Sequence, residues 1–271
     1  MFFKSRKSSF LWLYNHNSSS RAKLKDKDWI LYEQAFEKYF INRGVSSNDK
    51  DVIPRKLHLI WFGRPIPQYY LDLLEIWKKK LFGWEIYLWD EAKASKITMT
   101  NQSYFDAAKN LGLKSDIFRY EILFQMGGVY VDTDFFAIKT LDDLLYLDFF
   151  TGTGHLSEAG VFNGLIGARK ESKVILKCIE SISRVGINES SDMDIINSTG
   201  PGLLSDTVKW SLQQNVEKIV VFPTVFFYPF PATLRKELDL IPVRSLGNRL
   251  KKYVTSETYC VHLWHTSWDE K

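Results

Sequence analysis

The stretch LKSDIFRYEILFQMGGVYVDTDFF, residues 113–136, decides the fold of this chain. Its apolar residues recur at helical spacing up to Gly127, whereas residues 129–131 are β-branched or aromatic, as in a strand. Side chains two apart on a strand share a face, so we expect Asp132 and Asp134 to point toward one spot at the strand's end. Two carboxylates suit Mg²⁺ or Mn²⁺, ions that usually share their ligands with substrate phosphates. The segment therefore predicts a metal-assisted site for a phosphorylated ligand.

The Asp-x-Asp spacing is a weak signal by itself. It occurs four times, at 26/28, 49/51, 132/134 and 192/194. Three of these pairs lie in polar surroundings typical of loops or helix starts, where Asp is favoured for turns and caps. Only the third pair has β-branched and aromatic neighbours on both sides, and burying two carboxylates there is costly without a cation. The alternative is a strand that ends in a polar turn.

Strand and helix patterns alternate along the rest of the chain. The patterns predict strands over 56–62, 84–89, 161–168 and 218–222, and helices over 28–42, 69–80, 103–110, 114–126, 141–145, 171–183 and 201–213. Gly112 is expected to separate two of the helices. This alternation indicates an α/β domain with a largely parallel, covered sheet. We expect residues 1–52 to form a basic tail with a helical extension, and residues 53–271 to form the main domain.

Composition excludes several classes. The 271 residues are 45% hydrophobic, and 36 basic against 32 acidic residues leave a net charge of +4, too balanced to indicate nucleic acid. Cys178 and Cys260 are the two cysteines, which favours a reducing compartment. No run approaches the roughly 20 apolar residues of a membrane span. The chain is therefore expected in the cytoplasm, or exported without a cleaved signal. Residues 1–25 carry six basic and no acidic residues, so they predict either a loosely ordered tail or a peripheral membrane contact.

Two further regions offer polar groups. Asp116 and Arg119 lie three residues apart on the predicted helix and share a face. They are either an ordinary exposed ion pair or a pair that holds the hydroxyls and phosphate of a sugar donor. Trp61 ends the first strand as a core residue or as a stacking face for a nucleobase.

The sequence YCVHLWHTSW, residues 259–268, contains a candidate imidazole ligand in His262 and a candidate phosphate or metal contact in Ser267. Its tryptophans, Trp264 and Trp268, are candidates for the walls of a pocket. Asn163 and the Thr199-Gly-Pro-Gly run are expected on the acceptor side, although proline at a helix start is also simple capping.

Several ordered blocks resemble the DXD-containing sugar transferases of glycosyltransferase family 32, which include fungal α-1,6-mannosyltransferases and bacterial capsular-polysaccharide transferases. The blocks are IPRKLHLIWFG (53–63), KSDIFRYEILFQMGGVYVDTD (114–134), FNGLIGA (162–168), TGP (199–201) and HLWHTSW (262–268). More remotely, residues 53–268 are similar to the glucosyltransferase domains of large clostridial toxins. The second of two adjacent family histidines is replaced here by Leu263, with a histidine at position 265 instead.

The resemblance implies a GT-A fold, a UDP- or GDP-linked hexose as donor, Mn²⁺ or Mg²⁺, and transfer with retention to a glycan, lipid-linked or protein acceptor. It also implies a role for each matching residue. Trp61 would stack on the nucleobase, and Ser267 and Trp268 would close over the diphosphate. The donor sugar would be bound by Asp116, Arg119, Asp132 and Asn163. The metal ion would be ligated by Asp132, Asp134 and His262. Whether a covalent intermediate forms stays open. A metal-dependent phosphohydrolase or nuclease using the same carboxylates, and a non-catalytic carbohydrate-binding protein, are the rival hypotheses.

Overall fold

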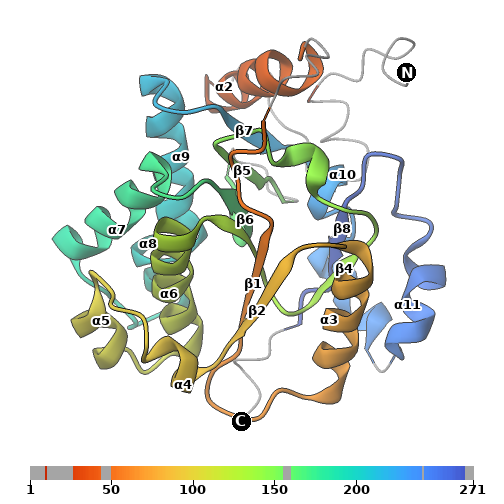
Figure 1. The fold of residues 1–271 in the computed structure, drawn as a ribbon, viewed down its shortest axis with the longest axis horizontal. Helices are drawn as coiled ribbons and strands as arrows, with labels where there is room; N and C mark the ends of the chain where they lie inside the picture. Colours follow the sequence, from red (N-terminus) through yellow and green to blue (C-terminus); the bar gives the residue numbers. More distant parts are fainter. Residues whose placement is uncertain (1–9, 11–26, 44–49, 155–159, 240, 266–271) are drawn as a thin grey trace.

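A six-stranded sheet forms the centre of the molecule (Figure 1). The computed structural model describes residues 10, 27–43, 50–154, 160–239 and 241–265. In the order β2-β1-β3-β6-β5-β7, the strands are Glu85–Trp89, Lys56–Ile60, Gly128–Val131, Phe162–Ala168, Phe149–Gly152 and Ile219–Phe222. Pairing is parallel for β1 with β2 and β3, and for β5 with β7, whereas β6 runs antiparallel to both of its neighbours.

Helices cover this sheet, with α5 to α9 on one side of β1 and with α3 and α11 on the other (Figure 1). The described helices are α2 Lys27–Phe36, η1 Glu37–Ile41, α3 Gln68–Lys80, α4 Glu91–Ala94, α5 Gln102–Ala107, α6 Leu111–Met126, η2 Asp142–Leu144, α7 Lys173–Val185, α8 Asp192–Ser198, α9 Pro201–Gln214, α10 Thr224–Phe227, η3 Ala232–Leu238 and α11 Val243–Leu250. This architecture confirms the predicted α/β class with a mostly parallel sheet flanked by helices, the arrangement expected of a GT-A fold. Every helix in the described ranges is too short or too polar to cross a bilayer.

Local chemistry fixes the helix that precedes the Asp pair. Asn110 caps α6, because its side chain accepts a hydrogen bond from the Leu113 N–H at 3.0 Å. Gly112 therefore lies inside the first turn of α6, and the expectation that it separates two helices is wrong. At the other end, Gly127 and Gly128 have φ angles of +61° and +115°. A Cβ at Gly128 would lie 2.6 Å from the Lys56 carbonyl oxygen, so only glycine fits this turn into β3.

A second sheet, which the sequence pattern did not indicate, pairs β4 (Phe135–Ala137) antiparallel with β8 (Cys260–His262), placing Phe135 opposite His262. The strand predicted to reach the two carboxylates instead ends at Val131. Residues 132–134 turn the chain from the large sheet into the small one, and the Phe135 N–H bonds back to the Asp132 carbonyl at 3.3 Å. The carboxylates consequently sit at the junction of the two sheets.

Two apolar cores hold these layers. The larger core surrounds the central sheet and includes Trp29 and Phe36 of α2. The ring of Phe36 meets the ring of Phe222 on β7 edge-on, with 5.9 Å between the ring centres. The smaller core lies between α3, α11 and the β4–β8 sheet, with Phe136 and Leu246 among its members. The predicted boundary at residue 52 stays a prediction, but α2 packs directly on the main domain.

Candidate active site

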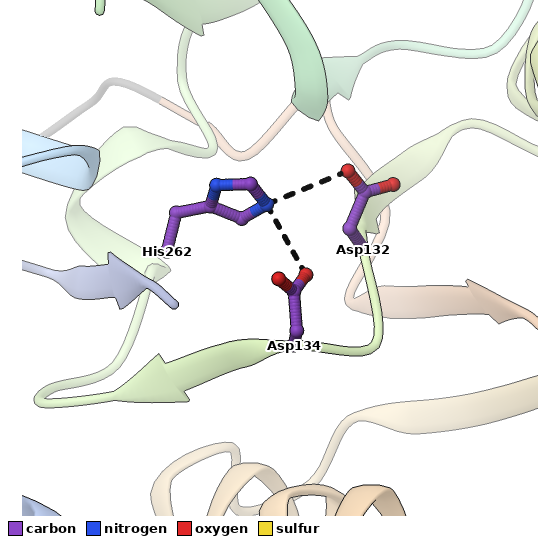
Figure 2. A group of neighbouring side chains, drawn as sticks. All are labelled: Asp132, Asp134 and His262. Carbon is purple, nitrogen blue, oxygen red and sulfur yellow. Dashed lines mark ion pairs between the residues drawn. The ribbon is translucent and has the colours of Figure 1, made fainter. Parts of the chain in front are cut away.

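Three potential metal ligands converge at the junction of the two sheets (Figure 2). His262, on β8, directs Nε2 between the carboxylates, 3.1 Å from Asp134 Oδ1 and 3.8 Å from Asp132 Oδ2. One ligand atom from each residue lies within 4.8 Å of the other two. The predicted convergence of Asp132 and Asp134 on one spot is therefore observed, and His262 joins them from a segment about 130 positions away in the chain.

The two carboxylates are held differently. Asp134 is 5% exposed, and its Oδ2 accepts a hydrogen bond from the His265 backbone N–H at 2.8 Å. The Asp132 side chain is 32% exposed, and its Oδ1 accepts a hydrogen bond from the Tyr130 hydroxyl at 2.6 Å. Asp134 is thus fixed from inside the protein, whereas the side chain of Asp132 is partly exposed to solvent.

Proton affinities in the cluster reflect a buried opposite-charge pair. Burial by itself lowers the pKa of His262, but the charge of Asp134 and its hydrogen bond outweigh burial and raise that pKa above its ordinary value. Burial likewise acts to raise the pKa of Asp134, but the charge and hydrogen bond of His262 lower it. A positive charge between these carboxylates is therefore favourable, whether a proton on His262 or a metal ion supplies it.

The residues present fit a hard divalent cation. Two carboxylates and an imidazole are ligands that Mn²⁺ accepts, with further positions left for water or phosphate oxygens. Space for the Asp132 carboxylate comes from Gly164 on β6, where a Cβ would lie 2.6 Å from Asp132 Oδ2. His262 Nδ1 is buried and has no hydrogen-bond partner among the described residues, so Nε2 is the ring nitrogen that meets the two carboxylates.

Asp116 and Arg119 form a second polar group, on α6. They are 6% and 5% exposed and are joined by a 2.9 Å ion pair, so the alternative of an exposed surface pair is wrong. Asp116 also accepts hydrogen bonds from Asn163 Nδ2 at 2.8 Å and from the Thr199 hydroxyl at 3.0 Å. Burial raises the pKa of Asp116, against the opposing effect of Arg119 and these donors.

Arg119 connects this group to the metal-ligand cluster. Its Nη1 donates to the Asn163 carbonyl at 2.7 Å and lies 3.5 Å from Asp132 Oδ1. Its guanidinium also sits 4.4 Å from the centre of the Tyr130 ring. The structure thus joins the buried Asp116, Arg119 and Asn163 to the partly exposed Asp132 in one network. Their common role at the donor sugar stays a prediction.

The tryptophans named from the sequence have different surroundings. Trp61 is 8% exposed, packs on Tyr70 in the smaller core, and donates its indole N–H to the Arg64 carbonyl at 2.8 Å. Its role in nucleobase stacking stays a prediction. Trp264 has a φ angle of +62° and stands edge-on to His262 at 4.2 Å, with its indole N–H donating to Phe230. Trp264 therefore orients the imidazole.

Ser267 and Trp268 lie outside the described residues, as does the basic segment 1–9 and 11–25 of the predicted tail. Sequence reasoning gave no role to the Tyr130 hydroxyl or to the His265 backbone N–H. Tyr130 was recoverable, because it lies two residues before Asp132 on a strand face. The contact from the His265 backbone N–H could not be predicted, because any residue except proline provides the same backbone donor.

Comparison with known proteins supports a single enzyme class. Residues 67–150 match the family described as the glycosyltransferase sugar-binding region containing a DXD motif. Inositol phosphoceramide mannosyltransferase 3 of Schizosaccharomyces pombe is 26% identical over 175 residues, covering 63% of this chain and 48% of that protein. Lactosylceramide 4-alpha-galactosyltransferase of Mus musculus is 27% identical over 164 residues, covering 57% of this chain and 41% of that protein. The chain thus spans about half the length of these relatives or less.

Among solved structures, the UDP-bound glycosyltransferase domain of the YGT toxin aligns with a TM-score of 0.47 and 9% identity, over 75% of this chain and 90% of that one. The sequence matches and the position of the Asp132–Asp134 motif within the matched region confirm the resemblance predicted from the sequence. Residues 67–150 of this chain therefore match a glycosyltransferase sugar-binding region, with Asp132 and Asp134 at its DXD motif.

Proposed function

We propose that this glycosyltransferase is metal-dependent, and that it moves a hexose from a UDP- or GDP-linked donor to its acceptor with retention at the anomeric carbon. One observation carries the proposal: the Asp132–Asp134–His262 cluster is joined through Arg119 to the buried Asp116–Asn163 group. A site for a cation and a site for sugar hydroxyls therefore adjoin, as a nucleotide-sugar requires.

Each side chain has a task that follows from its surroundings. Asp134, which is buried, and His262, whose side chain is 12% exposed, would anchor a divalent cation, which when bound would neutralise the charge that builds on the departing diphosphate. Asp132, whose Oδ2 accepts no hydrogen bond from the described residues, would bind ribose or sugar hydroxyls beside that cation. Arg119 holds Asp132 in place, because its guanidinium lies 3.5 Å from Asp132 Oδ1.

The network also bears on the stereochemical course. Asp116 is poorly suited to attack the anomeric carbon, since both of its oxygens already accept bonds from Arg119, Asn163 and Thr199. Its buried charge is instead placed to stabilise a cation-like sugar. Front-face displacement, in which the acceptor attacks on the side from which the diphosphate leaves, gives retention without a protein nucleophile.

For the acceptor we propose a lipid-linked molecule over a free glycan or a protein side chain. Two relatives are named for lipid acceptors, inositol phosphoceramide in one case and lactosylceramide in the other. Such an acceptor would bring the enzyme to a membrane surface.

The test is a thermal-shift screen of UDP- and GDP-hexoses with and without Mn²⁺, followed by transfer assays. A true donor present at about 100 times its dissociation constant stabilises the folded protein by about 2.7 kcal/mol. We expect this shift to need the metal, and to be lost in Asp134→Asn but kept in Asp106→Asn, which alters an exposed carboxylate on α5. Full transfer activity in EDTA would contradict the proposal.

The rival phosphohydrolase hypothesis makes an opposite prediction, namely release of inorganic phosphate from substrates without a nucleotide-sugar. Two-metal hydrolysis needs a second set of ligands about 4 Å from the first ion. Across the described part of the chain, one group of three candidate ligands is found, which favours the transferase.

A further inference from the structure

A cavity of about 680 Å³ lies outside the site described above, on the segment that precedes β8. This segment, residues 232–253, comprises η3, α11 and the residues that follow, and we call it the basic lobe. The cavity is lined by side chains from both of its helices and from the residues after α11; they are Glu237, Leu238, Asn248, Arg249, Lys251, Lys252 and Tyr253.

The basic lobe carries an excess of positive charge. It contains six basic residues against two acidic ones, an excess equal to the net charge of the whole chain. All six basic residues are exposed; they are Arg235, Lys236, Arg244, Arg249, Lys251 and Lys252. Within the described residues, the lobe is therefore a surface of net positive charge.

Within the described part of the chain, one of these six cations, Lys252, has an ion pair. Lys252 lies 3.5 Å from Glu237. Among the described residues, by contrast, neither Arg249 nor Lys251 has an ion pair or a side-chain hydrogen bond. Both lie at the carboxyl end of α11, whose dipole favours cations. Helix capping does not account for them, because their side chains donate to none of the last carbonyls in the described chain.

The shape of the surface favours a compact anion over a polymer. Arg249 and Lys251 share the cavity with the partly buried ring of Tyr253 and the amide of Asn248. The cavity also holds the ion pair between Lys252 and Glu237, so two of its three cations lie beside an apolar wall and an amide without a carboxylate partner in the described chain. This set suits a phosphate ester attached to a hydroxyl-rich group. A nucleic acid would instead call for an extended basic track with stacking faces.

The lobe is also next to the active site. Its buried face, which includes Leu246, packs in the smaller core with Phe136 of β4, and Val261 of β8 lies in the same core. These are the two strands that follow Asp134 and carry His262. A membrane held by the lobe would therefore lie one layer of structure away from the catalytic cluster.

We propose that the cavity of the basic lobe binds the phosphate-bearing headgroup of an anionic lipid, so that this surface docks the enzyme on an anionic bilayer. The proposal does not depend on the transfer reaction, because binding is measured without donor or metal. It also differs from a contact through the N-terminal tail, which every variant below retains.

The experiment measures binding of the full chain to vesicles of phosphatidylcholine, alone and mixed with phosphatidylinositol. Arg249→Gln/Lys251→Gln should bind the mixed vesicles roughly 10- to 30-fold more weakly than the unmodified protein. The matched control is Lys170→Gln/Lys173→Gln, which removes two exposed charges near the start of α7. It should change binding about twofold or less, because exposed charges beyond a Debye length are screened. Equal binding by the two double variants would overturn the proposal.

A second measurement places the contact. An environment-sensitive dye on Asn248→Cys should respond to mixed vesicles, whereas the same dye on Val185→Cys, 75% exposed at the end of α7, should not. The native Cys178 and Cys260 are buried and will not compete for label. Equal responses at positions 248 and 185 would overturn the assignment to the lobe.

Two other outcomes would replace the lipid with a different ligand. If soluble inositol phosphate stabilises the protein in a way that requires Arg249 and Lys251, and vesicles do not bind, the cavity serves a free phosphate ester. If single-stranded RNA binds with the same dependence and vesicles do not, the lobe is a nucleic-acid surface. Either result would overturn the proposal.

Discussion

Replacing Arg119 with methionine tests whether the buried network is held by charge. The guanidinium makes a 2.9 Å pair with Asp116, a 2.7 Å bond to the Asn163 carbonyl and a 3.5 Å approach to Asp132. Methionine fills much of the same volume but leaves Asp116 buried without its cation. Removing one partner of a buried ion pair costs about 3–5 kcal/mol, and we expect a loss of this size in the free energy of unfolding, measured by urea titration.

The control is Arg55→Met. Arg55 pairs with Asp51 at 2.8 Å, but its side chain is half exposed, so the loss should be about 0–1 kcal/mol. The double variant Arg119→Met/Asp116→Asn removes the stranded charge and should recover part of the stability lost in Arg119→Met alone. If Arg119→Met and Arg55→Met cost the same, the reasoning is refuted.

The same variant has a pH signature whose sign follows from burial. The pKa of Asp116 is already raised by burial, and Arg119 opposes that rise; without Arg119 the pKa rises further. A carboxyl whose pKa is higher in the folded than in the unfolded state takes up a proton on folding, so folding is favoured at low pH and loses that contribution as pH rises through the folded-state pKa. The deficit of Arg119→Met should therefore shrink as pH falls below neutral. A deficit independent of pH would show that Asp116 is not the stranded charge.

Three further predictions concern the metal-ligand cluster. Gly164→Ala places a Cβ 2.6 Å from Asp132 Oδ2. Because that carboxylate can turn toward solvent, the urea midpoint of unfolding should hardly change. The displaced carboxylate should nevertheless lower kcat/KM at least about tenfold. Tyr130→Phe removes the 2.6 Å hydrogen bond to Asp132. The loss should cost about 1.5–3 kcal/mol, either in transition-state stabilisation, measured as kcat/KM, or in the free energy of unfolding. If neither value changes, this hydroxyl has no such role. The raised pKa of His262 means that its proton competes with a metal, so the Mn²⁺-induced thermal shift should grow as pH rises through that pKa and should lose this dependence in His262→Gln. Without metal the sign is opposite, since the stability from the protonated His262–Asp134 pair is lost as pH rises through the same pKa.

Most strands of the large sheet could be predicted from the sequence, because their apolar patterns lie in consecutive residues. The strands β1, β2, β6 and β7, and the helices α3, α6, α7 and α9, follow from apolar periodicity and from glycine or proline at their ends. The strands that were missed, β4, β5 and β8, are three or four residues long. So short a segment shows no measurable alternation, and its extended form comes from tertiary pairing.

The sequence predicted which residues form the candidate site, but it did not predict how the fold brings them together. Asp132, Asp134 and His262 were named from the sequence, and they do converge. The route by which they meet was not predictable, because it depends on a pairing between β4 and β8 across more than 120 positions. Burial of Asp116 and Arg119 was also open, since a helical i, i+3 pair looks the same on a surface and in a core.

The pairing of β4 with β8 divides the catalytic apparatus between two halves of the gene product. A break in the exposed stretch around Asn188 and Ser190 would leave both aspartates on one fragment and His262 on the other. Neither fragment alone would hold a complete ligand set. Activity would return only on their reassociation, which makes this chain a candidate for a split-enzyme reporter in which signal reports directly on the meeting of two fused partners.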